Sequence, residues 1–388
     1  MPTNGRAPED TGRSSTTDVT RDAITRALHS PRHVSGLTHG YYRYPAAFSP
    51  ELAREVIAQY SNPGDIVLDP FIGGGTTAVE AIASGRRAAA IDINTLAAFV
   101  GGVKTRPLSA RGWGALRSWA DSLSSVFDGS RAPVDLPGEV GEFVATAMSR
   151  LGELPPGGVR SAGRCALLRL GQWALESCRE TPDADRCLAK LTAIINGMND
   201  GMDRLVESAS LAGISKSEIV RSRRIAVGSS DMQGPYDRVL EVGEHPTLIV
   251  TSPPYPRVHV LYSRWQVNSR REIALPYDIA ACRDGSPPSY YTMGPRTDAG
   301  EEQYFRRMGA AFDHLYHSLA PGGVLAQVVG FNRVERQFDR YVGLLAARGF
   351  TQVDISGIER QVPNRRWYAR GTTFDSGREY LLIHRKPS

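Results

Sequence analysis

The chain has 388 residues, of which 41% are hydrophobic, so it is long enough for one large or two medium domains with a buried core. The formal net charge of +5 only mildly favours a polyanionic partner. No apolar run reaches the roughly 18 residues that a membrane helix needs, and no signal-peptide core is present, so we expect a cytoplasmic protein without membrane contact. The four scattered cysteines lack zinc spacing, which predicts reduced thiols and no metal site.

The first 104 residues predict a disordered tail followed by the start of a nucleotide-binding sheet. Residues 1–21 are polar and rich in Ser, Thr, Pro and Gly, which is typical of disorder. Ser49 and Pro50 have the residue types of a helix N-cap and a first helical position. A strand, a glycine loop, a helix and a second strand follow over residues 64–70, 71–77, 78–84 and 87–92. This order predicts a doubly wound α/β fold, with a parallel sheet covered by helices on both faces.

Residues 105–222 predict an inserted helical domain. Helical composition covers 116–127, 140–151, 164–178, 187–199 and 202–212, and no convincing strand lies among them. The insert separates a first catalytic part, 22–104, from a second, 223–388. It has no dense basic cluster, so contact with a target, a lid and a dimerisation surface all stay open as its role.

The second catalytic part predicts the remainder of the sheet. Strand patterns occur at 224–227, 247–251, 324–329, 351–356 and 379–384. Amphipathic helices are expected at 301–319 and 336–348.

The glycine loop predicts a nucleotide-like ligand. Glycines between a strand and a helix let the backbone approach a ligand, and the helix N-terminus favours an anionic group. Gly73, Gly75 and Ala78 also fit the GxGxxA dinucleotide pattern, so the loop alone leaves a nicotinamide cofactor open. Asp92 ends the second strand, where a carboxylate can accept hydrogen bonds from both ribose hydroxyls.

The segment Thr251-Ser252-Pro253-Pro254-Tyr255 predicts the catalytic site. It lies at the carboxyl end of an apolar strand, where ligands bind in open α/β sheets. Two consecutive prolines stiffen the chain and remove two backbone donors, which leaves carbonyl acceptors. An exocyclic amine is a poor nucleophile until acceptors hold its hydrogens. We therefore expect Ser252 Oγ and the Pro253 carbonyl to accept from such an amine, and Tyr255 to stack on its ring, for a direct transfer without a covalent intermediate.

Two segments resemble a known family. Residues 69–77, DPFIGGGTT, resemble the D-P-F-x-G-x-G-T-T motif of DNA amino-methyltransferases, and residues 44–52 resemble that family's second cofactor motif. Asp231 resembles the acid that holds the adenine amino group. The resemblance implies a Rossmann-like methyltransferase sheet with S-adenosylmethionine as cofactor. The expected cofactor-binding residues are Phe48, Ser49, Asp69, Pro70, Phe71, Gly73, Gly75, Thr76, Thr77, Asp92 and Asp231.

The catalytic motif also resembles one branch of that family. The form [ST]-P-P-[YF] leans toward the N4 amine of cytosine, whereas D-P-P-Y is usual for the N6 amine of adenine. Ser252 therefore implies N4-cytosine methylation of DNA, in restriction-modification or a related defence system. The alternatives are amino-methylation of adenine or of RNA, and a catalytically silent nucleic-acid-binding relative. C5-cytosine methylation fits poorly, because Cys282 follows Ala281 and not a proline.

The expected partner is double-stranded DNA with the target base flipped out, because a stacked base cannot reach such a site. Basic and aromatic residues follow the catalytic motif and recur late in the chain, as in nucleic-acid grooves. The expected substrate-binding residues are Arg257, Tyr262, Trp265, Arg366, Trp367 and Tyr368. The motif order resembles the family's α arrangement, which would place target recognition in the insert. The sequence is compatible with a monomer or a homodimer.

Overall fold

A computed structural model gives the fold for most of the chain. It describes residues 16–30, 35–44, 49–125, 127, 134–178, 180–257, 265–267, 271–285, 291–353, 357–361 and 378–388. No helix within these ranges is both long and apolar enough to cross a membrane.

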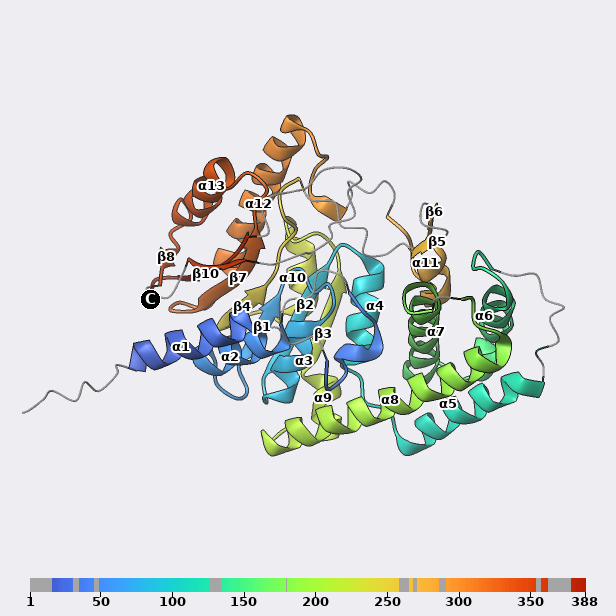
Figure 1. Cartoon of the computed structure of the whole chain (residues 1–388). Helices are drawn as coiled ribbons and strands as arrows, with labels where there is room; N and C mark the ends of the chain where they lie inside the picture. Colours follow the sequence, from blue (N-terminus) through green and yellow to red (C-terminus); the bar gives the residue numbers. More distant parts are fainter. Residues whose placement is uncertain are drawn as a thin grey trace, which may run out of the picture.

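The core is one mostly parallel sheet in the order β3-β2-β1-β4-β7-β10-β8 (Figure 1). The strands are β1 (Ile66–Asp69), β2 (Arg87–Asp92), β3 (Arg223–Val227), β4 (Leu248–Thr251), β7 (Val324–Gly330), β8 (Thr351–Gln352), β9 (Ile358–Gln361) and β10 (Arg378–Arg385). Strands β3, β2, β1, β4 and β7 run parallel, and β10 is antiparallel to β7, β8 and β9. This confirms the predicted doubly wound α/β class. The strand order reverses between β1 and β4, and ligands bind at such a switch point.

Each face of the sheet is covered by its own hydrophobic cluster. On one face lie α1 (Thr16–His29), α2 (Pro50–Tyr60), α3 (Thr76–Ala83) and α4 (Thr95–Lys104). On the other lie α10 (Gln233–Val239), α12 (Asp298–Ser318) and α13 (Val334–Ala346). Strands β1 and β4 are buried along their whole length, which explains their continuous apolar runs.

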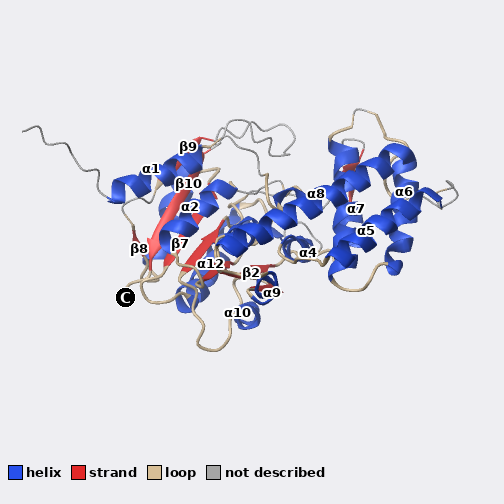
Figure 2. Ribbon diagram, turned by 90° about the horizontal axis from the view of Figure 1, so that it is seen from below, coloured by secondary structure: helices blue, strands red, loops and turns tan. Residues whose placement is uncertain are grey.

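The insert is helical, as expected, and it shares its core with the sheet. It contains α5 (Ala110–Ser122), α6 (Glu139–Arg150), α7 (Gly158–Glu176), α8 (Ala184–Leu211) and α9 (Lys216–Arg221). Its apolar residues belong to the same cluster that covers α2 and α3. Figure 2 shows α5, α6 and α7 grouped beside the sheet, with α8 extending from them to it.

A segment that follows β4 in the chain joins the insert in space. The hairpin of β5 (Trp265–Val267) and β6 (Arg271–Ile273), with α11 (Leu275–Ala280), packs against α7. The helical lobe therefore draws on both sides of the predicted boundary at residue 222.

Three predicted boundaries are wrong in detail. Helix α1 begins at Thr16, so the last residues of the expected disordered tail are helical. Helix α8 is continuous where two helices were expected around Gly201. A Cβ at Gly201 would lie 2.3 Å from the carbonyl oxygen of Leu37, so this glycine permits a close backbone approach and does not end a helix. Strand β8 covers only Thr351–Gln352 of the expected 351–356, of which 354–356 lie outside the described residues.

Candidate active site

A cleft opens at the carboxyl ends of β1 and β4, and it encloses about 860 Å³ of space open to solvent. Its walls come from the glycine loop after β1, from the end of β2 and from the segment after β4. Residues 229–230 and helix α12 contribute another side.

Asp69, the last residue of β1, ties the two strands together at the switch point. Its Oδ1 accepts hydrogen bonds from the Phe71 amide at 3.1 Å and from Thr251 Oγ1 at 2.7 Å. Thr77 Oγ1 adds a 3.0 Å hydrogen bond to the Val250 carbonyl. Burial raises the pKa of Asp69 to about 6, although the Thr251 hydrogen bond acts against that rise. Asp69 and Thr77 thus hold the glycine loop against β4.

The glycine loop needs backbone conformations that side chains disfavour. Gly73 has φ of +45° and Gly75, the N-cap of α3, has φ of +78°. A Cβ on Gly73 would lie 3.2 Å from the ring of Tyr44, which lines the cleft opposite the loop. Gly75 offers no side chain to the first turn of α3, so no side chain caps those amides.

Asp92 presents a fixed carboxylate to the cleft. Its Oδ2 accepts from the Gly73 amide at 2.9 Å, and its Oδ1 accepts from the Asn94 amide at 2.8 Å. Burial raises the pKa of Asp92 to about 6 against these two hydrogen bonds. Each oxygen keeps a second lone pair, which is the acceptor arrangement that two vicinal hydroxyls need.

The insert holds the segment that carries Tyr44. On α7, Gln172 Oε1 accepts a hydrogen bond from the Arg43 amide at 3.1 Å, and Gln172 Nε2 donates one to the Arg43 carbonyl at 2.9 Å. On α8, the Met198 carbonyl accepts from Tyr41 Oη at 2.5 Å. The insert therefore supports the segment that brings Tyr44 to the cleft.

A buried lysine joins this segment to the glycine loop. Lys104 Nζ donates to the Gly74 carbonyl at 2.7 Å and to the Tyr42 carbonyl at 3.2 Å. Burial lowers the pKa of Lys104 to about 8. The ammonium group serves the architecture here, because it ties the backbone of the glycine loop to the backbone of the segment before Tyr44.

The predicted cofactor residues differ in where they lie. Those that line the cleft are Asp69, Phe71, Gly73, Thr76 and Asp92. Pro70, Gly75 and Thr77 support the loop, and the Pro70 carbonyl accepts a hydrogen bond from Ser230 Oγ. Ser49 is the N-cap of α2 and 7% exposed, and its hydroxyl has no hydrogen-bond partner among the described residues. Phe48 lies outside the described residues.

Asp231 is engaged by an arginine that the sequence did not reveal. Arg307 Nε, on α12, lies 2.6 Å from Asp231 Oδ2, and the same guanidinium donates to Ser229 Oγ at 2.9 Å. Burial by itself would raise the pKa of Asp231, but the hydrogen bonds from Arg307 and Ser229 lower it below its ordinary value. Ser229, Ser230 and Arg307 line the cleft, whereas Asp231 lies behind them.

All four residues of the catalytic motif line the cleft: Ser252, Pro253, Pro254 and Tyr255. Tyr304 Oη, on α12, donates to the Pro254 carbonyl at 2.8 Å. The Pro253 carbonyl accepts no hydrogen bond from the described residues. Tyr255 Oη lies 3.5 Å from Ser252 Oγ and donates to Glu379 Oε1 at 2.9 Å. Glu379 is the second residue of the distant strand β10, and nothing in its sequence context predicts this contact.

The predicted substrate-binding residues lie in different places in the structure. Arg257 lies next to the motif and forms an ion pair with Asp298 at 2.5 Å. The prediction for Trp265 is wrong, because its ring is 5% exposed and packs against Gly171 in the core. The remaining four, Tyr262, Arg366, Trp367 and Tyr368, lie outside the described residues. No metal-binding group of three or more His, Cys, Asp or Glu side chains occurs in the described ranges.

Comparison with known proteins finds a family match for the segment that forms one side of this cleft. Residues 9–98 match the N6_N4_Mtase family model, described as DNA methylase, and this segment carries Tyr44, the glycine loop and Asp92. The segment that forms one side of the cleft is therefore similar to DNA methylases, over less than a quarter of the chain. The methyl donor of such methyltransferases is S-adenosylmethionine.

Two curated proteins are similar over short stretches. The DNA adenine methyltransferase YhdJ of Escherichia coli K12 is 49% identical over 55 residues, which are 14% of this chain and 19% of YhdJ. The Type II methyltransferase M.MvaI of Kocuria varians is 43% identical over 75 residues, which are 19% of this chain and 16% of M.MvaI. The chain thus matches less than a fifth of the length of either relative.

Among solved structures, the rRNA methyltransferase aviRa of Streptomyces viridochromogenes is similar over 97% of this chain and 95% of its own. Its sequence identity is 12% and its TM-score 0.35, a likeness too weak to bear on substrate.

Proposed function

We propose that this chain transfers a methyl group from S-adenosylmethionine to the exocyclic amine of a DNA base, with the N4 amine of cytosine as the favoured target. One observation carries the proposal: the cofactor loop and the Ser-Pro-Pro-Tyr motif follow adjacent strands and line one cleft. Cofactor and acceptor would then meet at the switch point of the sheet.

The residues of the cofactor half fit S-adenosylmethionine. Asp92 would accept from both ribose hydroxyls, because its two oxygens are held toward the cleft by backbone amides. The uncapped first turn of α3 favours the carboxylate of the methionine moiety. The cofactor supplies an activated methyl group on a sulfonium for in-line displacement.

The motif residues would orient the amine. Ser252 Oγ and the Pro253 carbonyl both lie at the cleft, and each can accept one amine hydrogen. The Pro254 carbonyl is already bonded to Tyr304, so that hydrogen bond fixes the loop and leaves Pro253 for the substrate. Tyr255 would stack on the flipped base, while Glu379 holds its hydroxyl. Orientation of this kind supplies much of the rate in such transfers.

Ser252 supports cytosine, since an aspartate stands there in the usual adenine form of the motif. The name of the relative YhdJ supports adenine instead, and M.MvaI supports a place in restriction-modification. We accordingly propose adenine N6 as the second candidate. We further propose double-stranded DNA with a flipped base as the substrate, and the cytoplasm as the location.

The test is a methylation assay with radiolabelled S-adenosylmethionine. Genomic DNA from a host without this gene, the same DNA as single strands, and total RNA are each incubated with the protein. Modified nucleosides are then identified by mass spectrometry. We expect label in duplex DNA as N4-methylcytosine, and none with the Ser252→Ala variant. Label as N6-methyladenine would move the target to the second candidate, and label only in RNA, or in none of the substrates, would overturn the proposal.

A further inference from the structure

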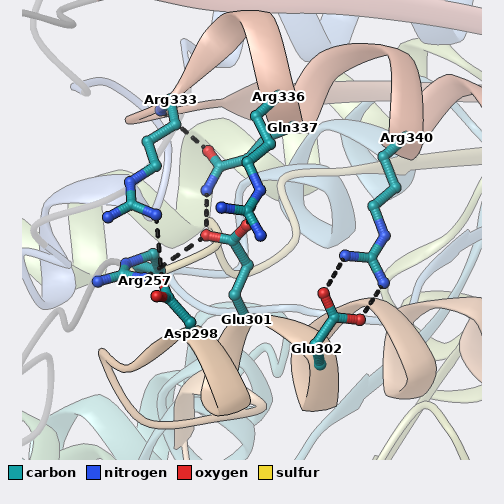
Figure 3. Close-up of polar contacts among 8 residues, drawn as sticks. All are labelled: Arg257, Asp298, Glu301, Glu302, Arg333, Arg336, Gln337 and Arg340. Atoms are coloured by element: carbon teal, nitrogen blue, oxygen red, sulfur yellow. Dashed lines mark hydrogen bonds and ion pairs between the residues drawn. The ribbon is translucent and has the colours of Figure 1, made fainter.

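We propose that Arg257 and Arg333 form a binding site for a backbone phosphate of DNA, and that the carboxylate of Asp298 holds this place in the free protein. The inference rests on the proposed function and extends it to the strand that carries the target base. It depends on three side chains of the network in Figure 3.

Three segments bring these side chains together beyond the carboxyl ends of β4 and β7. Arg257 follows Tyr255 by two residues and has a φ of +60°, a left-handed conformation that is uncommon for a residue with a side chain. Arg333 follows β7, the parallel neighbour of β4, so both arginines lie beyond carboxyl ends of strands. Asp298 is the first residue of α12.

The geometry around Asp298 is the one that an anionic oxygen needs. Its Oδ1 lies 2.5 Å from Arg257 Nη1 and 3.1 Å from Arg333 Nη1, so one oxygen bridges two guanidinium groups. Phosphate oxygens are held in the same way, by charge-assisted hydrogen bonds from arginine. Each guanidinium has five N–H donors, and these contacts use only one from each.

Exposure makes Asp298 a replaceable partner. Its side chain is 71% exposed, and the Arg333 side chain is 44% exposed. Ion pairs this open to water contribute little to stability, because solvent screens them. DNA releases condensed counterions when a protein binds its phosphates, and this release favours binding. A DNA phosphate can therefore displace the carboxylate from the two arginines.

A second carboxylate in the network behaves differently. Glu301 is 1% exposed, accepts a hydrogen bond from Gln337 Nε2 at 2.9 Å, and lies 3.8 Å from Arg257 Nη1. Buried in this way, Glu301 keeps Arg257 in place whether or not Asp298 is bound. Arg257, the more buried of the two arginines, is thus preorganised for an incoming anion.

The position suits a phosphate beside the flipped nucleotide. Helix α12 carries Asp298 at its start and Tyr304 further along, and Tyr304 bonds to the Pro254 carbonyl of the catalytic motif. One helix therefore links the phosphate site to the loop that would hold the base. A strand bound at Arg257 and Arg333 would run past the mouth of the cleft.

The same helix offers a matched control. Glu302 forms a two-point ion pair with Arg340, at 2.7 and 2.5 Å, and the Arg340 guanidinium lies 4.2 Å from the centre of the Phe305 ring. This pair is complete in itself, since no other carboxylate among the described residues lies at hydrogen-bond distance from Arg340. Glu302→Gln removes the same charge from the same helix as Asp298→Asn without freeing the proposed site.

The experiment measures binding of a fluorescein-labelled duplex oligonucleotide by anisotropy over a salt series. We expect the Asp298→Asn variant to bind the duplex up to about fivefold more tightly than wild type, because the Asp298 carboxylate no longer competes with the DNA phosphate for the two arginines. Arg333→Gln and Arg257→Gln should bind about tenfold more weakly and lower the slope of log affinity against log salt by up to about 1. Glu302→Gln should change affinity by less than Asp298→Asn does.

Equal effects of Asp298→Asn and Glu302→Gln would overturn the inference, because they would reflect net charge alone. So would an arginine variant that keeps wild-type affinity and slope, or tightening by Asp298→Asn that occurs only on an RNA duplex. Thermal unfolding of each variant checks that the fold is intact. Failure here with DNA methylation intact leaves the proposed function standing, whereas absent methylation of every substrate removes the function itself.

Discussion

The hydroxyl of Tyr255 donates a 2.9 Å hydrogen bond to the carboxylate of Glu379, a residue 124 positions later in the chain. Tyr255 lines the cleft, and Glu379 is 4% exposed at the start of β10. The last strand of the sheet therefore fixes the orientation of the aromatic ring in the catalytic motif. This contact leads to the first prediction.

Glu379→Gln should lower kcat by about tenfold with little change in KM for S-adenosylmethionine, because a misplaced ring spoils base orientation and leaves the cofactor site intact. Tyr255→Phe, which keeps the ring and loses the hydroxyl, should show the same split. Tyr255→Ala should lose nearly all transfer. Steady-state kinetics on methylatable DNA measure the split. Full activity of Tyr255→Ala would exclude the stacking role.

Ser252→Ala should reduce kcat by roughly 10²–10³, the usual cost of one oriented polar group at a reacting centre. Binding of S-adenosylhomocysteine should be unchanged, since Ser252 lies on the acceptor side of the cleft. Single-turnover transfer and calorimetry measure the two quantities. Loss of cofactor binding in this variant would move Ser252 to the cofactor site.

Cofactor affinity should rise with pH and level off above about 7. Burial raises the pKa of Asp69 and of Asp92 to about 6, and the ionised carboxylates are the better acceptors for ribose hydroxyls and for a cationic amine. The ligand-free protein should show the opposite trend. Its folded state holds these protons more tightly than the unfolded chain, so the free energy of unfolding falls as pH rises from about 4 to about 6.

Calorimetry with S-adenosylhomocysteine between about pH 5 and about pH 8, and thermal unfolding between about pH 4 and about pH 8, test the two trends. Asp92→Asn should weaken binding and reduce its pH dependence. Affinity that stays constant across this range in the wild-type protein would contradict the role given to the two carboxylates.

Arg307→Met should weaken binding of S-adenosylhomocysteine by about tenfold, because the guanidinium lines the cleft and holds Asp231 and Ser229. Arg307→Lys should restore only part of the affinity, since an ammonium group cannot span both partners. Wild-type affinity in Arg307→Met, together with weak binding in Asp231→Asn, would favour direct contact between Asp231 and the adenine amino group.

Gln172→Leu should weaken cofactor binding even though it lies in the insert. The Gln172 side chain hydrogen-bonds to the backbone amide and carbonyl of Arg43, next to Tyr44 at the cleft. A leucine would leave both backbone groups without these hydrogen bonds. Arg117→Ala, at an exposed position of the same insert, is the control and should bind as wild type. Equal affinity in the two variants would show that the insert does not support the cofactor site.

Much of the fold could be predicted because its signals are local. The apolar runs of β1 and β4, the helix start at Pro50 and the glycine loop all depend on neighbouring residues. The position of residues Ser252 to Tyr255 directly after a buried strand could also be predicted from the sequence. By contrast, Gly201 suggested the end of a helix, because the close approach of Leu37 that requires a glycine there is invisible along the chain.

The sequence by itself determined the doubly wound class, the glycine loop and the position of the Ser-Pro-Pro-Tyr segment after a buried strand, since periodicity, turn residues and short motifs encode these locally. Only the tertiary structure decided which distant side chains meet them. Arg307 reaches Asp231, Glu379 reaches Tyr255, and Trp265 enters the core instead of a surface groove. Such pairings depend on how helices and strands far apart in sequence pack together, and long-range packing is a property of the folded chain as a whole.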